Sequence, residues 1–442
     1  MIRRKFMAML MGTVAAAYST FTPRAFAAGE ELNIFWAEWD PANYLQELVN
    51  DFTKETGVKV TVSTTPWSDF QTKTFAELNA HGDAYDLIVG DSQWLGVGSE
   101  QKHWVDLTDF FKTHDLKNKF LSATVAGYAE YPAASGKYWA IPLEGDVNGW
   151  AYRKDWFTDP KEMANFKAKY GYELGVPKDQ KALRDIAEFF NRPDQKRYGV
   201  ALYSDNSYDA VAMGVEQTIF SYGGSLGDYA TYKIDGIVNS KESIAGLKAY
   251  HDLFKFTPPG WNKSFFAENN QAITENLAAM SMNFFAFFPA LANPKTNPHA
   301  ADTGFFANPP GAGGAHFAAL GGQGVSIVSY SKKRDLAMKF LEWFVKDETQ
   351  KKWADLGGYT CSKAVLESPE FLKATPYNQA FYDSMSIVRD FWAAPEYAEL
   401  LDQLNKNVYP YVVNDKGSAE EALNGVVKDW TATFNKYNRY KK

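Results

Sequence analysis

Strands and helices alternate over residues 31–90, and this alternation restricts the fold more than any other feature of the sequence. Short apolar or β-branched stretches typical of buried strands lie at 31–36, 58–63 and 86–90. Between them, 44–52 and 70–79 carry apolar residues at helical spacing. A chain that alternates in this way builds a sheet with helices packed on its faces. We therefore predict an α/β fold.

The segments that follow these three strands have a common composition, in which indole rings stand beside acidic and amide side chains. Ligands of α/β sheets bind beyond the carboxyl ends of the strands, so all three segments are expected at one edge of the sheet. A single tryptophan there often closes the rim of a core, but three similar loops favour a binding site. The candidates are Trp36, Glu38, Trp39, Asp40, Trp67, Asp91 and Gln93.

Length and composition exclude several classes of protein. The 442 residues predict two or three domain-sized units, at roughly 150 residues each. A formal net charge of −7 argues against nucleic-acid binding. The lone Cys361 excludes an internal disulfide and is expected to be partly buried, and the six histidines show no metal-ligand spacing. We expect no metal and no cofactor.

Residues 1–27 have the layout of a bacterial export signal. A basic start at Arg3, Arg4 and Lys5 precedes an apolar stretch over 6–18, and Ala25-Phe26-Ala27 supplies a cleavage frame. The stretch is shorter than the roughly 20 residues that span a bilayer. The paired arginines are compatible with twin-arginine export as well as with the general secretory route. The mature chain, 28–442, is expected in the periplasm.

A series of ordered motifs resembles the extracellular solute-binding proteins of ABC importers, in the group that includes maltose-binding protein. The resemblance covers essentially the whole mature chain. One departure is Asn283-Phe-Phe-Ala-Phe287, which stands where many members carry Gly-x-Trp. The motifs are Asp86-Leu-Ile-Val-Gly-Asp91, Gly136-Lys-Tyr-Trp-Ala-Ile-Pro142, Gly149-Trp-Ala-Tyr-Arg-Lys-Asp155, Tyr222-Gly-Gly224 with Gly246-Leu-Lys-Ala-Tyr250, Ala279-Met-Ser-Met282, and Lys339-Phe-Leu-Glu-Trp-Phe344 with Gln350.

The resemblance implies a two-lobed periplasmic-binding-protein fold with three interlobe crossovers and a C-terminal helical extension. It places 28–145 and 284–326 in the first lobe, and 146–283 and 327–442 in the second. Hinges are expected at 144–148, 282–283 and 325–327, where a few residues absorb the closing motion. The cleft candidates that the resemblance adds are Glu144, Asp146, Asn148, Tyr222, Gly223, Phe285, Gln323, Tyr359 and Arg389.

Aromatic rings and polar side chains suit a carbohydrate, which presents apolar C–H faces and hydroxyl edges. We predict a monomeric receptor that is not an enzyme. It binds a mono- or oligosaccharide or a polyol by hinge closure and delivers it to the permease subunits of an ABC transporter in the inner membrane. A polyamine receptor would use the same acids and tryptophans. A secreted glycoside hydrolase would need two carboxylates roughly 5–10 Å apart. For Arg389, an internal ion pair with Asp390 and a contact to ligand hydroxyls both remain open.

Overall fold

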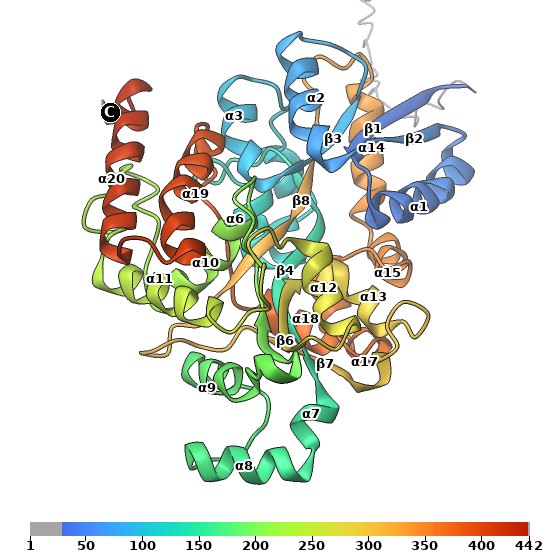
Figure 1. The fold of residues 1–442 in the computed structure, drawn as a ribbon. Coiled ribbons are helices and arrows are strands. Elements are labelled where there is room, and N and C mark those ends of the chain that lie inside the picture. The colour runs from blue at the N-terminus through green and yellow to red at the C-terminus, as the bar shows by residue number, and fades with distance from the viewer. Residues whose placement is uncertain (1–28, 441–442) are drawn as a thin grey trace, which may run out of the picture.

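A single mixed sheet runs through the molecule and links its two halves (Figure 1). The structure is a computed structural model that describes residues 29–440, so the predicted export signal at 1–27 lies outside the described residues. Within 29–440, no helix is long and apolar enough to cross a membrane. The sheet has the order β2-β1-β3-β8-β4-β6-β5, with β7 paired to β4 and β9 to β8. The strands are β1 Glu31–Ala37, β2 Lys59–Thr65, β3 Leu87–Asp91, β4 Ile141–Arg153, β5 Tyr198–Ala201, β6 Ala278–Phe284, β7 Thr303–Ala307, β8 Ala318–Ile327 and β9 Val388–Arg389.

The predicted alternation of strands and helices over residues 31–90 is confirmed. Strand β1 pairs in parallel with β2 and β3, and α1 (Asp40–Thr56) and α2 (Trp67–Asn79) connect them. Helix α1 begins after Trp39 and ends at Gly57, whose φ of 76° is the left-handed conformation that glycine adopts without strain. Because Ala37 lies opposite Thr65, the loops after β1 and β2 emerge side by side.

The first lobe is built around a core that combines the N-terminal strands with two helices from far along the chain. Phe52 of α1 packs its ring 5.5 Å from that of Phe340 and 5.4 Å from that of Trp343. This part of the chain forms two helices, which are separated at 345–346. The other helices of this lobe are α3 Leu95–Glu100, α4 Thr108–Thr113, α5 Leu116–Lys119, α6 Ser122–Tyr128, α14 Arg334–Phe344 and α15 Asp347–Asp355.

The second lobe has its own core, in which helices cover β5, β6 and β7. Trp430 is fully buried there and donates a hydrogen bond from Nε1 to the carbonyl of Leu400 at 2.9 Å, which ties the last two long helices together. Its helices are α7 Lys154–Thr158, α8 Pro160–Tyr170, α9 Gln180–Phe190, α10 Ala210–Ser221, α11 Lys241–Phe254, α12 Phe266–Thr274, α13 Phe288–Ala292, α19 Tyr397–Asn414 and α20 Ala419–Lys436.

Two neighbouring strands carry the chain between the cores. In β4, Leu143 belongs to the first core and Trp150 to the second; in β8, Ala319 belongs to the second and Leu320 to the first. The strands pair antiparallel, so both crossings lie side by side. A third crossing runs through 362–390, which holds α16 Lys363–Leu366, α17 Pro369–Ala374 and α18 Asn378–Met385 in a smaller cluster.

This packing differs from the lobe boundaries expected from the sequence. The segment after residue 326 was expected in the second lobe, yet Phe340 and Trp343 pack against Phe52 of the first. The expected crossover at 282–283 lies inside the second core, and Phe306 is buried there too. The motifs marked the strands correctly but carried no information about which core each strand faces. We propose 29–143 with 321–361 as the first lobe, and 147–319 with 391–440 as the second.

These boundaries can be tested with Phe340→Leu. The substitution changes the shape of a fully buried side chain that contacts Phe52, and we expect the free energy of unfolding to fall by about 1 kcal/mol. Hydrogen exchange should show that the lost protection is concentrated in β1 and α1. Loss of protection mainly in α10, α19 and α20 would instead support the lobe boundaries that were expected from the sequence.

Candidate functional site

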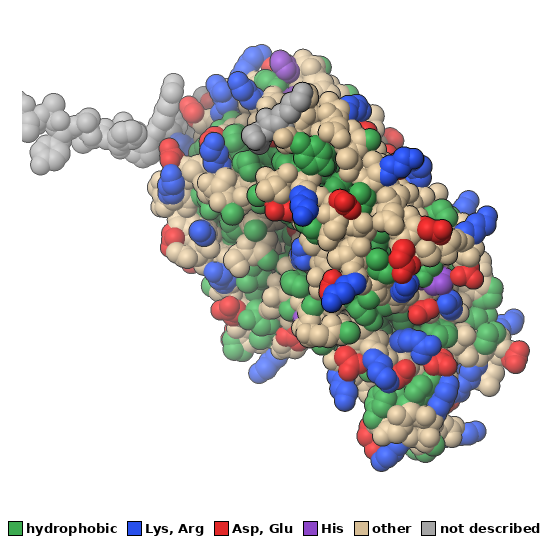
Figure 2. Space-filling view, turned by 90° about the vertical axis from the view of Figure 1, so that its left-hand side faces the viewer, with side chains coloured by type: hydrophobic (Ala, Val, Ile, Leu, Met, Phe, Trp, Pro, Cys, Tyr) green, Lys and Arg blue, Asp and Glu red, His purple; other side chains and the backbone are tan. Residues whose placement is uncertain are grey.

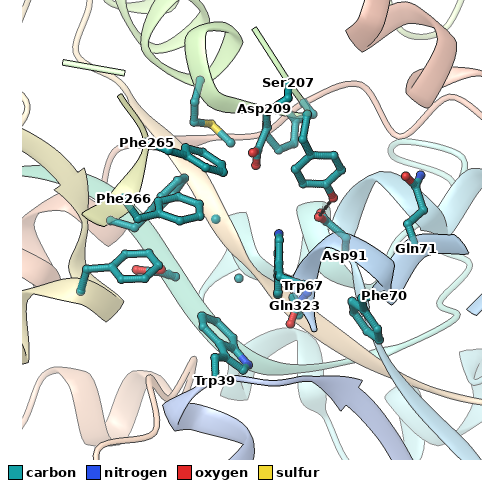
Figure 3. A pocket seen from close by; sticks show the side chains of 18 of the residues that line it. Trp39, Trp67, Phe70, Gln71, Asp91, Ser207, Asp209, Phe265, Phe266 and Gln323 are labelled. Atoms are coloured by element: carbon teal, nitrogen blue, oxygen red, sulfur yellow. Dashed lines mark hydrogen bonds between the residues drawn. The ribbon is translucent and has the colours of Figure 1, made fainter. Parts of the chain in front are cut away.

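A cavity of about 600 Å³ lies between the two lobes (Figure 3). Loops of both cores and the crossing strands contribute to its walls. The side chains and backbone that line it are those of Glu38, Trp39, Trp67, Phe70, Gln71, Thr72, Asp91, Trp94, Asp146, Ser207, Tyr208, Asp209, Met213, Phe265, Phe266, Phe284, Phe287, Gly321, Gly322, Gln323 and Phe391.

The first lobe supplies a continuous aromatic wall. Trp39 lies with its ring centroid 5.5 Å from that of Trp67, which is in turn 5.9 Å from that of Phe70. Trp94 continues the row at 5.0 Å from Phe70. The ring of Trp36 stands edge-on beneath Trp39 at 5.5 Å and fixes its orientation. Aromatic rings held in this way offer rigid apolar surface at low entropic cost.

The second lobe supplies a facing aromatic wall. The rings of Phe265 and Phe266 stack at 3.7 Å, and Phe287 stacks on Phe266 at 4.4 Å. These residues come from the start of α12 and from the turn after β6. Figure 3 shows Phe265 and Phe266 across the cavity from Trp67 and Phe70. A flat ligand with apolar faces can therefore contact rings of both lobes at once.

Two glycines of β8 let this strand pass close to its neighbours at the cavity. A Cβ on Gly322, whose φ is 83°, would lie 2.4 Å from the carbonyl oxygen of Glu144, and one on Gly321 would lie 2.5 Å from the ring of Phe284. Gln323 follows them and accepts a hydrogen bond at Oε1 from Nε1 of Trp36. Its Nε2 is buried and has no partner among residues 29–440, which leaves a donor for a ligand.

Tyr208 connects the lobes across the cavity. It packs against the second core, and its hydroxyl donates to Oδ2 of Asp91 in the first lobe at 2.7 Å. Nε2 of Gln93 donates to the same hydroxyl oxygen at 2.9 Å. Tyr208 has a φ of 48°, a conformation that costs a residue with a side chain roughly 1–3 kcal/mol. Such strain is concentrated at functional sites, and here it accompanies the contact with Asp91.

Three carboxyl groups of the cavity, those of Asp91, Asp146 and Asp209, are shifted toward their neutral form because burial removes water from them. Burial raises the pKa of Asp146 to about 7, although its Oδ1 accepts backbone N–H bonds from Val147 at 2.8 Å and Ala286 at 3.1 Å. Burial and the neighbouring Asp91 raise the pKa of Asp209 to about 8. Burial also raises the pKa of Asp91, despite the hydrogen bonds it accepts.

Asp146 gives a test in the unliganded protein. Its pKa is raised on folding, so its contribution to stability is present at low pH and is lost as pH rises from about 4 through about 7. Asp146→Asn removes the charge and should increase the free energy of unfolding at pH 8 by roughly 1–2 kcal/mol, with little effect at pH 4. Urea unfolding at both pH values measures this. An equal effect at both would contradict the shift.

Six of the sequence-predicted residues line the cavity: Glu38, Trp39, Trp67, Asp91, Asp146 and Gln323. Two other predicted residues contact the lining from behind. Trp36 donates a hydrogen bond to Gln323, and Gln93 donates one to Tyr208. Asp40, by contrast, is exposed in the first turn of α1.

The remaining predicted residues lie outside the lining. Glu144 and Asn148 are fully buried in β4, and their polar side-chain atoms have no hydrogen-bond partner within the described chain. Tyr359 is buried and donates to the carbonyl of Phe285 at 2.6 Å, in the third cluster. Tyr222 and Gly223 lie where α10 ends.

Arg389 lies outside the cavity lining. Its guanidinium donates to the carbonyl of Gly224 at 3.1 Å and to Oγ of Ser225 at 2.7 Å, and it lies over the ring of Phe220 at 4.3 Å. These contacts join the end of α10 to the third crossing. The interaction is structural, and Cys361 is likewise a buried free thiol within the first core.

The second-lobe side of the site was missed from the sequence. Tyr208 and Asp209 stand between β5 and α10, which is the same position after a strand that singled out the first-lobe loops. The strand before them, β5, has only four residues, so its sequence signal is weak. The pair Phe265-Phe266 precedes α12 and has no comparable sequence signal.

A cavity that lies between two lobes, with the strands that join the lobes at its base, is the arrangement of a solute-binding protein. The chain belongs to the bacterial extracellular solute-binding protein family, whose model matches residues 37–351. This confirms the resemblance seen in the ordered motifs and the two-lobed α/β fold that it implied.

Known proteins that resemble the chain support the same fold. An erythritol/L-threitol-binding protein of Mycolicibacterium smegmatis is 20% identical over 75% of this chain and 70% of its own length. An ABC transporter solute-binding protein from Agrobacterium radiobacter K84, solved with ribitol, superposes with a TM-score of 0.75 at 24% identity, over 92% of this chain and 99% of its own. Maltose-bound MalE3 of T. maritima gives 0.75 at 20% identity, over 91% and 99%.

Proposed function

We propose that the protein is a receptor that captures a carbohydrate, either a sugar or a polyol, between its lobes and delivers it to an ABC permease. The observation that carries this proposal is the pair of facing aromatic walls, one from each lobe, with carboxylates between them. The rings contact the apolar faces of a sugar or carbon chain, and the polar groups bind its hydroxyls. The names of relatives that bind ribitol, maltose and erythritol point to the same class.

Unpartnered donors favour a carbohydrate over a polyamine. Nε2 of Gln323 and Nε1 of Trp39 are buried at the cavity and have no hydrogen-bond acceptor in the described part of the protein. Leaving such a donor unsatisfied costs roughly 1–3 kcal/mol. Hydroxyl oxygens of a carbohydrate accept from these groups, whereas a protonated polyamine has only donors. The sequence alone left the choice between a carbohydrate and a polyamine open, and these donors favour the carbohydrate.

The carboxylates are held as acceptors, which favours a receptor over a hydrolase. Asp91 accepts from Tyr208 and Gln93, and Asp146 accepts from two backbone amides. Hydrolysis of a glycoside needs one carboxyl group that gives a proton to the leaving oxygen and a second, free carboxylate on the opposite side of the bond, and Asp91 and Asp146 are both already engaged. We infer that the site binds its solute without changing it.

Ligand entry requires the lobes to separate, because the hydroxyl of Tyr208 bridges them across the cavity. We propose that this motion occurs about the paired crossings in β4 and β8. We also propose that residues 1–27 direct export and that the mature chain acts outside the cytoplasm. Solution scattering should then show compaction when the ligand is added.

The first experiment is a thermal-shift screen of residues 28–442 against sugars, polyols, oligosaccharides and polyamines, with chemical analysis of every ligand that binds. A ligand at a hundred times its dissociation constant should add about 2.7 kcal/mol of stability. A carbohydrate that binds and is recovered unchanged supports the receptor. A carbohydrate that is converted would identify an enzyme, and binding of polyamines alone would identify a different receptor.

A further inference from the structure

The cavity contains acidic groups that no basic side chain of the described residues balances. Its lining includes Glu38, Asp91, Asp146 and Asp209, and no lysine, arginine or histidine of residues 29–440. The outer surface is different: on the face shown in Figure 2, basic and acidic side chains are interspersed. The cavity lining, whose charged side chains within 29–440 are all acidic, therefore differs from this face of the surface.

Asp209 is the least compensated of these groups. It occupies the residue before α10, where an aspartate side chain commonly accepts a backbone N–H, but it makes no such bond. Only 7% of the residue is exposed, and Oδ1 has no partner within 29–440. Figure 3 shows the carboxyl group pointing into the cavity beside Phe265.

Asp91 and Asp209 act on one another across the edge of the cavity. The charge of Asp91 contributes to the raised pKa of Asp209. Asp91 already accepts the hydroxyl proton of Tyr208, so Tyr208 cannot also neutralise Asp209. An unpaired buried carboxylate is strongly unfavourable, and a cation between the two would relieve both. The face of the nearby Phe265 ring would add a cation–π attraction.

We infer that the carbohydrate carries a protonated amine and that Asp91 and Asp209 hold this ammonium group. The cargo is thus an amino sugar or an amino-polyol. The inference rests on the proposed function, because the hydroxyl groups of the same molecule satisfy the two unpartnered donors, Gln323 Nε2 and Trp39 Nε1. One ligand then supplies both the acceptors and the cation.

Binding of such a cargo should release a proton. The titratable groups that interact with Asp209 are Asp91, Tyr203, Tyr208 and Glu216, and none of them is a base. With a pKa of about 8, Asp209 is mostly neutral at pH 6 in the empty protein and must ionise to pair with an ammonium group. The affinity for an amino-polyol, whose ammonium group stays charged over this range, should therefore increase from pH 6 to pH 8. A neutral polyol should not gain affinity over this range.

The test compares ligands that differ only in one group. Isothermal titration at pH 7.5 measures D-glucitol against 1-amino-1-deoxy-D-glucitol, and D-glucose against D-glucosamine, with spermidine in parallel. We expect the amine of a pair to bind at least tenfold more tightly, which corresponds to about 1.4 kcal/mol. In Asp209→Asn this ratio should fall to about one. Asp69→Asn makes the same charge change on an exposed residue of α2 and should leave the ratio unchanged.

The outcomes separate the two proposals. If the neutral member of a pair binds as well as the amine or better, the cationic cargo is wrong and the carbohydrate receptor stands. If spermidine binds while no member of either pair does, the carbohydrate receptor itself is wrong. The pH series on the unaltered protein gives an independent measurement should Asp209→Asn fold poorly. An affinity for 1-amino-1-deoxy-D-glucitol that falls from pH 6 to pH 8 would overturn the inference.

Discussion

Replacing Trp39 with alanine should weaken cargo binding by roughly ten- to a hundredfold without unfolding the protein. The indole lines the cavity at one end of the first-lobe wall, where it contacts Trp67 and is supported by Trp36. Its burial against a ligand face is worth roughly 1.5–3 kcal/mol, and each 1.4 kcal/mol is about a factor of ten in affinity. Titration calorimetry with the ligand identified in the screen measures the effect.

Two matched variants distinguish a direct contact with the ligand from a role in supporting the structure around the cavity. Trp39→Phe keeps a ring in place and should lose much less affinity than the alanine variant. Trp36→Ala removes a fully buried side chain that also donates to Gln323, so it should lower the free energy of unfolding as well as the affinity. Unchanged affinity in folded Trp39→Ala would remove the loop after β1 from the site.

The first-lobe wall could be predicted from the sequence because its geometry follows from local rules. Three parallel strands end at one edge, so the residues after each strand must lie close together, and Trp39, Trp67 and Asp91 do line one cavity. Of the nine residues that the resemblance added, only Asp146 and Gln323 line the cavity. Of the alternating Glu144, Asp146 and Asn148, Asp146 alone reaches the cavity.

The second-lobe wall depends on long-range packing that leaves little trace in the sequence. Phe265 and Phe266 look like two more core residues, and only the fold brings their rings opposite the tryptophans. Tyr208 reaches Asp91 across 117 positions of sequence by adopting a left-handed backbone conformation. The lobe boundaries that we propose from the packing differ from those expected for the same reason, since Phe340 joins a core that begins with β1.

Tyr208→Phe should weaken binding by roughly tenfold or more by making closure less favourable. The variant keeps the ring and removes the hydroxyl, and with it the 2.7 Å bond to Asp91 and the 2.9 Å bond from Gln93. A hydrogen bond to a charged group is worth about 1.5–3 kcal/mol, and here it joins the two lobes directly. Because the open form makes no such bond, its loss acts on the equilibrium between open and closed forms, and the apparent affinity falls with the closed population.

Solution scattering distinguishes this effect from a lost ligand contact. At a ligand concentration that saturates the unaltered protein, Tyr208→Phe should remain more expanded, and it should compact fully only at higher concentration. Tyr222→Phe removes a hydroxyl from the same lobe at the end of α10, outside the cavity lining, and should bind and compact normally. If Tyr208→Phe bound with unchanged affinity, the contact between Tyr208 and Asp91 would not contribute to closure, and the two crossing strands would have to set the closed form without it.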